Sequence, residues 1–255
     1  MSKKLRVLSI IAASTLVAGV AIAPAANAGT KQKVCVALDT AGINDKSFNQ
    51  TSYEGAKAAK AAGYASTIEY LPAKSGADYV PNIKKFLDKK CTLIIGIGYL
   101  LGDAIGDAAA KNPGVNFALV DGWSGGKNQK GITYKTDENS FLVGYLAAGM
   151  SKTGKVATYG GKPYGTVTIF MDGYAKGVAH YNKVKGKKVQ VLGWDTAKQD
   201  GLMVGNFSDM AKALQYSKSF EQQGADVILP VGGNLGSSTA ENALKTKKSV
   251  VIWVD

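Results

Sequence analysis

Short apolar runs alternate with helical segments along most of this sequence, and that alternation restricts the fold more than any other feature. Eight runs have the length and composition of buried strands: residues 33–38, 66–71, 92–97, 115–120, 155–159, 188–193, 225–231 and 249–254. Segments rich in Ala and Lys at helical spacing lie between most of them, for example 77–89, 104–111, 137–151 and 207–223. The sequence therefore predicts an α/β fold with parallel strands and with helices on both faces of the sheet.

The length of the chain indicates two α/β lobes. About 227 residues follow the N-terminal segment described next, which is too many for one small sheet. The stretch DGWSGGKNQKG, residues 121–131, follows a predicted strand and combines glycines with polar residues, as is typical of a hinge. We therefore expect an N-terminal lobe over residues 29–124 and a C-terminal lobe over residues 125–255.

The first 28 residues have the pattern of a secretory signal peptide. A basic start that ends at Arg6 precedes an apolar run over residues 8–22, and an A-x-A cleavage site ends at Ala28. The apolar run is shorter than the roughly 20 residues that a membrane anchor needs. We predict cleavage after Ala28 and a secreted, extracytoplasmic protein. No cysteine stands at the cleavage site, so no lipid attachment (lipobox) is expected there.

The two cysteines, Cys35 and Cys91, favour a disulfide over two free thiols. Cys35 lies in the first predicted strand and Cys91 directly precedes the third, and in a 2-1-3 strand order these strands are neighbours. Secreted chains keep such pairs oxidised. In the chain-entropy model, closing this loop stabilises the fold by roughly 4 kcal/mol.

The charged and reactive residues exclude several classes of function. The formal charge is +12, and it falls to +9 when residues 1–28 are removed, which we interpret as a lysine-rich solvated surface. Arg6 is the only arginine, so no nucleic-acid partner is expected, because base and phosphate readers rely on the arginine fork. His180 is the only histidine, which argues against clustered zinc sites and triads. We predict no cofactor, no metal site and no catalytic residue.

Polar residues follow several of the predicted strands, where ligands bind in open α/β sheets. Asp39, Asp121 and Asp255 each follow an apolar run, and so does Gly232. One such aspartate can simply cap the next turn. Several that converge on one cleft would accept hydrogen bonds from a neutral ligand rich in O–H and N–H groups.

The stretch LDTAGINDKSFNQ places a phenylalanine and an amide at the start of a helix. Ser47 and Gln50 have the spacing of a capping box, which predicts a helix from Phe48 to a point near Gly63. Phe48 and Asn49 then stand in the first turn. Phe48 either packs as a hydrophobic staple or offers its face to a planar heterocycle whose edge meets the amide.

This motif resembles the N-terminal motif of the basic membrane protein family, the substrate-binding components of ABC transporters that include purine-nucleoside binders. Further segments agree in order across the mature chain: DTAGINDKSFNQTSYEG, NPGVNFALVD, ENSFLVGYLAAGMSKTGKVATYGG, FSD, GADVILPVGGNLG and VVIWVD. The resemblance implies the type I periplasmic-binding-protein fold, in which two Rossmann-like lobes joined by a hinge close on a ligand.

The same resemblance implies roles for individual residues. Phe48 would be one stacking face of a purine base and Phe207 the opposing aromatic ring. Asn49 and Asp121 would contact the base edge. The ribose hydroxyls would be held by Asp39, the backbone around Gly232, and Asp255.

Two departures from the family pattern accompany this resemblance. Family members usually carry a lipobox cysteine, whereas this sequence has an A-x-A site, which leaves its association with the cell surface unexplained. The sequence also stops at Asp255, where the family has a last strand that returns to the first lobe, so we expect a C-terminally truncated first lobe.

The leading hypothesis is a monomeric substrate-binding protein that delivers a purine nucleoside to an ABC permease. One alternative keeps the fold with a sugar or a signalling molecule as ligand. A second alternative is a secreted nucleoside-processing enzyme that uses the aspartates with calcium, which would make its activity sensitive to chelator.

Overall fold

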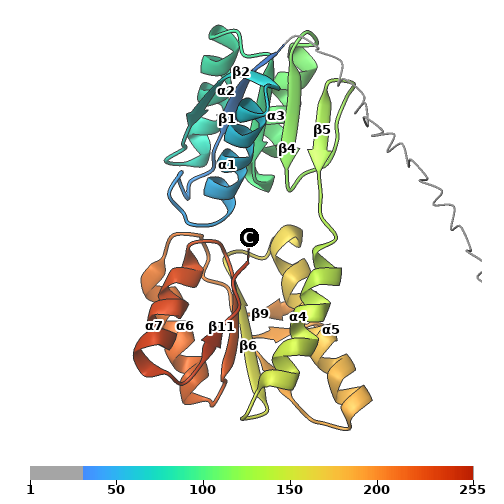
Figure 1. Ribbon diagram of the computed structural model, residues 1–255, viewed down its shortest axis with the longest axis vertical. Coiled ribbons are helices and arrows are strands. Elements are labelled where there is room, and N and C mark those ends of the chain that lie inside the picture. The colour runs from blue at the N-terminus through green and yellow to red at the C-terminus, as the bar shows by residue number, and fades with distance from the viewer. Residues whose placement is uncertain (1–30, 255) are drawn as a thin grey trace, which may run out of the picture. The chain divides into compact units, whose positions relative to one another are not determined.

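The computed structural model describes residues 31–254, so the predicted signal peptide and Asp255 lie outside the described residues. Its first sheet has five parallel strands in the order β2-β1-β3-β4-β5 (Figure 1). The strands are β1 (Gln32–Ala37), β2 (Ala65–Leu71), β3 (Leu93–Ile97), β4 (Asn116–Val120) and β5 (Gln129–Ile132). The helices of this part are α1 (Phe48–Ala61), η1 (Gly76–Asp78), α2 (Tyr79–Asp88), η2 (Tyr99–Leu101) and α3 (Gly102–Lys111).

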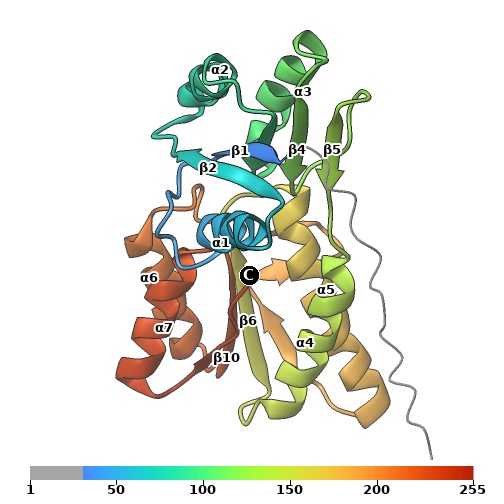
Figure 2. The same cartoon turned by 45° about the horizontal axis from the view of Figure 1, so that its top comes forward.

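Strand β1 shows why helices cover both faces of this sheet. Successive side chains of a strand point to opposite faces. Val34 and Val36 pack in one buried cluster with Ala56 of α1, whereas Cys35 packs in another with Phe86 of α2. Figure 2 shows α1 on one side of the sheet and α2 and α3 on the other. The apolar run of β1 is therefore continuous because both of its faces are buried.

The second sheet has four parallel strands in the order β11-β10-β6-β7. They are β6 (Lys155–Gly160), β7 (Gln190–Leu192), β10 (Val227–Val231) and β11 (Val250–Val251), and the short strands β8 (Trp194–Asp195) and β9 (Asp200–Gly201) form a separate antiparallel pair. Helices α4 (Thr136–Met150) and α5 (Gly165–Lys185) cover one face, and α6 (Met210–Gln222) and α7 (Leu235–Thr246) cover the other (Figure 1).

Each of the eight predicted apolar runs overlaps an observed strand of one of the two sheets. The α/β class with parallel sheets is thereby confirmed. Strand β5 was not predicted, and it pairs in parallel with β4, with Val120 opposite Ile132. The predicted boundary after residue 124 assigns this strand to the second lobe, whereas its hydrogen bonds place it in the first sheet. The residues after β4 loop back to extend that sheet, and the chain leaves it after Ile132.

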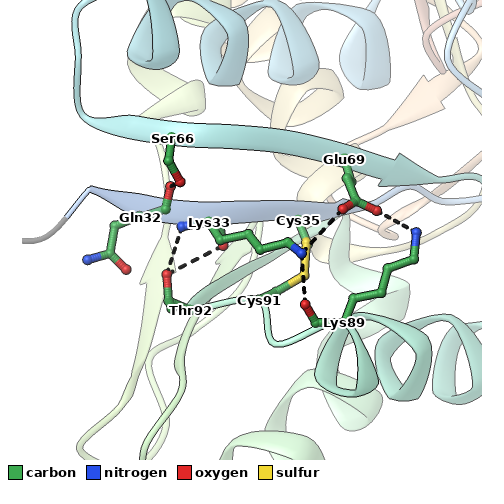
Figure 3. Close-up of a disulfide and its surroundings, with 8 residues drawn as sticks. All are labelled: Gln32, Lys33, Cys35, Ser66, Glu69, Lys89, Cys91 and Thr92. Atoms are coloured by element: carbon green, nitrogen blue, oxygen red, sulfur yellow. Dashed lines mark hydrogen bonds and ion pairs between the residues drawn. A yellow bond between two sulfur atoms is a disulfide. The ribbon is translucent and has the colours of Figure 1, made fainter.

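The Cys35–Cys91 disulfide is present, as predicted, and joins β1 to the turn that precedes β3 (Figure 3). The two Cα atoms are 6.1 Å apart and both side chains are buried. The predicted 2-1-3 strand order is confirmed, since β1 lies between β2 and β3. Beside the disulfide, Lys33 donates from Nζ to the carbonyl oxygen of Lys89 at 2.8 Å (Figure 3).

Helices α4 and α5 cross at very short range, because glycines stand at the crossing. A Cβ atom added at Gly144 would collide with the carbonyl oxygen of Tyr174, and one at Gly177 with that of Phe141. The glycines of the SFLVGYLAAG segment thus have a packing role. In the part of the chain that the structure describes, no helix combines the length and the apolar character needed to cross a membrane.

Candidate functional site

A cavity opens where the carboxyl ends of the strands of the two sheets face each other, and we call it the central cavity. It encloses about 700 Å³, part of it open to solvent. Five of the predicted site residues line it: Asp39, Phe48, Asp121, Phe207 and Gly232. Asp39, Asp121 and Gly232 follow β1, β4 and β10, so the cavity lies at the strand ends, the place where open α/β sheets usually bind ligands.

The first turn of α1 is held by Asp45 rather than by the predicted capping box. The Ser47 side chain makes no capping hydrogen bond. Asp45 instead accepts from the backbone N–H groups of Ser47, Asn49 and Gln50 at 3.0, 2.8 and 3.0 Å. Ser47 donates from Oγ to the carbonyl oxygen of Val254 at 3.3 Å. The carboxylate of Asp45 therefore satisfies the free donors of the helix start, and it also lines the central cavity.

Asp39 is half-buried and its Oδ1 atom carries two hydrogen bonds. It accepts from Asn49 Nδ2 at 2.6 Å and from the backbone N–H of Ala41 at 2.9 Å. Burial raises the pKa of Asp39; these two hydrogen bonds oppose the shift and the nearby charge of Asp45 adds to it. The carboxyl group is thus held at the cavity in an environment that disfavours its charge.

Asn49 differs from its predicted place. Its side chain is fully buried and does not line the central cavity, where it was expected to contact a base edge. Its amide donates to Asp39, and its Oδ1 atom has no hydrogen-bond partner. The amide of Asn49 therefore holds the carboxyl group of Asp39 in position without itself lining the central cavity.

Phe48 and Phe207 both line the central cavity, one from each side of it. Phe48 begins α1, and its ring lies close to Gly98, whose φ of +103° favours glycine. The ring of Phe207 lies so close to Gly161 that a Cβ atom at that position would collide with it. Phe207 precedes α6, whose start is capped by Asp209 through the N–H of Lys212 at 2.9 Å.

A row of aromatic rings crosses the central cavity and was not predicted. The ring centroids of Tyr99 and Tyr164 are 5.7 Å apart, and those of Tyr164 and Phe207 are 6.4 Å apart. Trp123 adds an edge contact to Tyr99 at 5.8 Å. The sequence indicates these rings only by their position after strands, since Tyr99 follows β3 and Tyr164 follows β6 by a few residues. Phe170 of α5 is a further aromatic lining residue.

Two further aspartates that follow apolar runs have different roles: one lines the central cavity and the other caps a turn. Asp121 lines the cavity with a φ of +57°, and its N–H donates to the carbonyl oxygen of Ile132 at 2.9 Å. Asp195, which follows another apolar run, does not line it. Its Oδ1 accepts from the N–H groups of Ala197 and Lys198, so this aspartate caps a turn.

No group of three or more metal-ligating side chains occurs among residues 31–254. His180 is exposed on α5, beside the ring of Phe141 at 5.4 Å, and it is not a lining residue of the central cavity. The chemistry of the cavity is therefore that of aromatic faces, carboxylates and backbone groups.

Two parallel sheets, each with helices on both faces and with their strand ends at one cavity, define the class of the periplasmic binding proteins. A solute-binding protein of an ABC transporter system from Aeropyrum pernix has this fold, with a TM-score of 0.73, 24% identity, and coverage of 86% of this chain and 60% of that one. The arabinose-binding protein AraP from Geobacillus stearothermophilus gives a TM-score of 0.60 at 16% identity, covering 88% of this chain and 74% of that one. Both comparisons support the predicted fold class.

Within that class the chain belongs to the family of PnrA-like ABC transporter substrate-binding proteins (Bmp), whose model matches residues 31–255. The resemblance found in the sequence motifs is confirmed. The ABC transporter nucleoside-binding protein BmpA of Lactococcus lactis is 32% identical over 239 residues, which cover 88% of this chain and 63% of that protein. Basic membrane protein D of Borreliella burgdorferi is 30% identical over 79% of this chain and 56% of its own length. The chain thus spans about three fifths of the length of such relatives.

Proposed function

We propose that this protein binds a purine nucleoside in the central cavity and presents it to an ABC permease outside the cytoplasm. The observation that carries the proposal is the presence of Phe48 and Phe207, from the two sides of the fold, in the lining of one cavity with Asp39 and Asp121. Flat aromatic faces stack on a base, and carboxylates accept its N–H groups and the sugar hydroxyls. The name of the Lactococcus lactis relative supports the same ligand class.

Each lining residue then has a role in this proposal. Phe48 and Phe207 stack on the two faces of the base, and Asp121 accepts from its edge. Asp39 and the backbone around Gly232 hold the ribose hydroxyls. Asn49 acts indirectly, because it fixes the Oδ1 atom of Asp39 through its amide.

We propose that the protein releases its ligand unchanged, in keeping with a family of substrate-binding proteins.

A thermal-shift and calorimetry series tests the proposal with adenosine, guanosine, inosine, cytidine, ribose and free adenine. A ligand at a hundred times its Kd adds about 2.7 kcal/mol to the folded state. For a chain of this size that raises Tm by roughly 5–11 °C. Purine nucleosides should produce this shift, whereas ribose alone should not. A shift with ribose or another free sugar and none with nucleosides would replace the proposal with the sugar-binding alternative.

Variants of Phe48 and Phe207 test whether these two rings bind the nucleoside. Phe48→Ala and Phe207→Ala should each raise the Kd for adenosine by about 10- to 100-fold, since stacking on a base contributes about 1–3 kcal/mol. Tyr64→Ala is the matched control, because the Tyr64 ring is 64% exposed and does not line the cavity. An unchanged Kd in both phenylalanine variants would exclude the stacked pose.

A further inference from the structure

We propose that the central cavity prefers a positively charged aromatic ring to a neutral ring of the same size. The ligand class is that of purine nucleosides whose base is methylated on a ring nitrogen and is positively charged at or slightly below neutral pH. This inference rests on the proposed nucleoside function and makes it more specific.

The first observation is the charge of the lining. Asp39, Asp45 and Asp121 all line the cavity, and its described lining residues include no lysine, arginine or histidine. A basic group does lie beside the lining: the Nζ atom of Lys162 lies over the Tyr164 ring, 5.7 Å from its centroid. Carboxylates near one another at a partly desolvated site repel, and a ligand cation relieves that repulsion.

The second observation is the free side of Asp39. Both of its hydrogen bonds end on Oδ1, and no donor among the described residues reaches Oδ2. The salt bridges found among these residues include neither Asp39 nor Asp45. The Oδ2 atom of Asp39 is thus left to a ligand, and a charged donor or a cationic ring forms a stronger interaction with it than a neutral group does.

The third observation is the number of aromatic rings. Phe48, Tyr99, Tyr164, Phe170 and Phe207 all line the cavity. The face of an aromatic ring attracts a cation by its quadrupole, and the attraction is larger at desolvated sites. A cation without a flat ring would lose the stacking, and a neutral ring would lose the attraction of faces and carboxylates. A cationic heterocycle uses both.

The test compares pairs that differ in charge and little in size. 1-Methyladenosine is a cation at neutral pH, and its isomer N6-methyladenosine is neutral. 7-Methylguanosine at about pH 6, where it is cationic, is compared with guanosine as a second pair, so that a clash of one methyl group does not decide the result. Calorimetry should show a Kd at least about ten-fold lower for the cation in one pair or both, and the ratio should shrink as salt is raised.

A variant assigns the preference to the carboxylates. Asp121→Asn removes one charge with little change of shape, and Asn tolerates the positive φ of this position. The ratio of the two Kd values should fall by at least about three-fold in this variant. Asp107→Asn is the matched control, because Asp107 is exposed on α3 and outside the cavity lining. The Tm of each variant is measured to confirm that it folds.

Failure of the inference and failure of the proposed function give different results. If the neutral nucleosides bind and neither cation binds more tightly, the preference is overturned while the nucleoside function stands. If the cations bind more tightly but Asp121→Asn and salt leave the ratio unchanged, the carboxylates are not its cause and the inference is overturned. If no nucleoside binds, neutral or charged, both proposals fall.

Discussion

Replacing Asp45 with alanine tests how the first turn of α1 is held. The Asp45 side chain is buried and accepts from three backbone N–H groups, those of Ser47, Asn49 and Gln50. Alanine leaves these donors without their acceptor. The turn carries Phe48 into the central cavity, so both stability and ligand binding depend on it.

The magnitude follows from the bonds that are lost. Replacing a capping side chain with alanine costs about 1 kcal/mol, and up to about 2 kcal/mol in proteins. Leaving a further buried donor unsatisfied costs about 1–3 kcal/mol. Together the two contributions come to about 2–5 kcal/mol. Because Asp45 lines a cavity that water can enter, we expect a loss in the lower half of that range, about 3 kcal/mol. For a chain of this size that lowers Tm by roughly 6–12 °C.

Urea unfolding followed by circular dichroism measures this loss in Asp45→Ala. Asp45→Asn keeps one acceptor oxygen and should lose about half as much free energy of unfolding. The surface control Asp107→Ala should change it by less than about 0.5 kcal/mol. A loss below about 1 kcal/mol in Asp45→Ala would refute the argument, because one ordinary hydrogen bond is worth that much.

Further predictions concern other parts of the fold. Replacing Cys35 and Cys91 together with serine should lower the free energy of unfolding by about 4 kcal/mol, since the disulfide closes a loop of 56 residues; an unchanged urea midpoint would contradict this. Gly144→Ala should destabilise by about 3 kcal/mol through collision with a carbonyl group of α5, while Gly165→Ala, which has open space at its Cβ position, should be neutral or stabilising by up to about 1 kcal/mol in the same melts. Because the pKa of Asp39 is raised on folding, the free energy of unfolding should fall as pH rises through the interval between its unfolded and folded pKa values. Asp39→Asn should weaken this pH dependence, stabilise the unliganded protein at neutral pH and weaken nucleoside binding. A stronger pH dependence in the variant would contradict the argument.

The alternation of apolar runs with helical segments predicted the two sheets, because parallel strands that are buried on both faces have continuous apolar sequences. Strand β5 escaped prediction for the opposite reason. Its residues Gln129–Ile132 include one large apolar side chain and alternate between half-buried and exposed, and they form a strand by pairing with β4. A segment whose conformation depends on a partner strand carries little signal of its own.

The order of the strands predicted which strand-end residues lie at the central cavity. It did not predict the hydrogen-bond partners of the side chains around the start of α1. Ser47 has the spacing of a helix cap, but its hydroxyl bonds to the carbonyl of Val254, 207 residues away. The nearby Asp45 takes the capping role, since its carboxylate reaches three N–H groups at once. The ring contact of Tyr99 with Tyr164 likewise depends on a distant segment.

Three unfavourable features of the described fold lie at the central cavity or in contact with one of its lining residues. Asp121 holds a positive φ there, the charge of Asp39 is disfavoured by burial, and the amide oxygen of Asn49 is buried without a partner. The positive φ of Asp121 and the unpaired amide oxygen of Asn49 each cost on the order of 1–3 kcal/mol. A structure that needed only to fold would gain by replacing Asp39, whereas a binding site keeps this carboxyl group available to donors that arrive with the ligand. A ligand that donates to Asp39 should therefore stabilise this part of the fold by more than its contact area alone implies, because it also stabilises the charged form that burial disfavours.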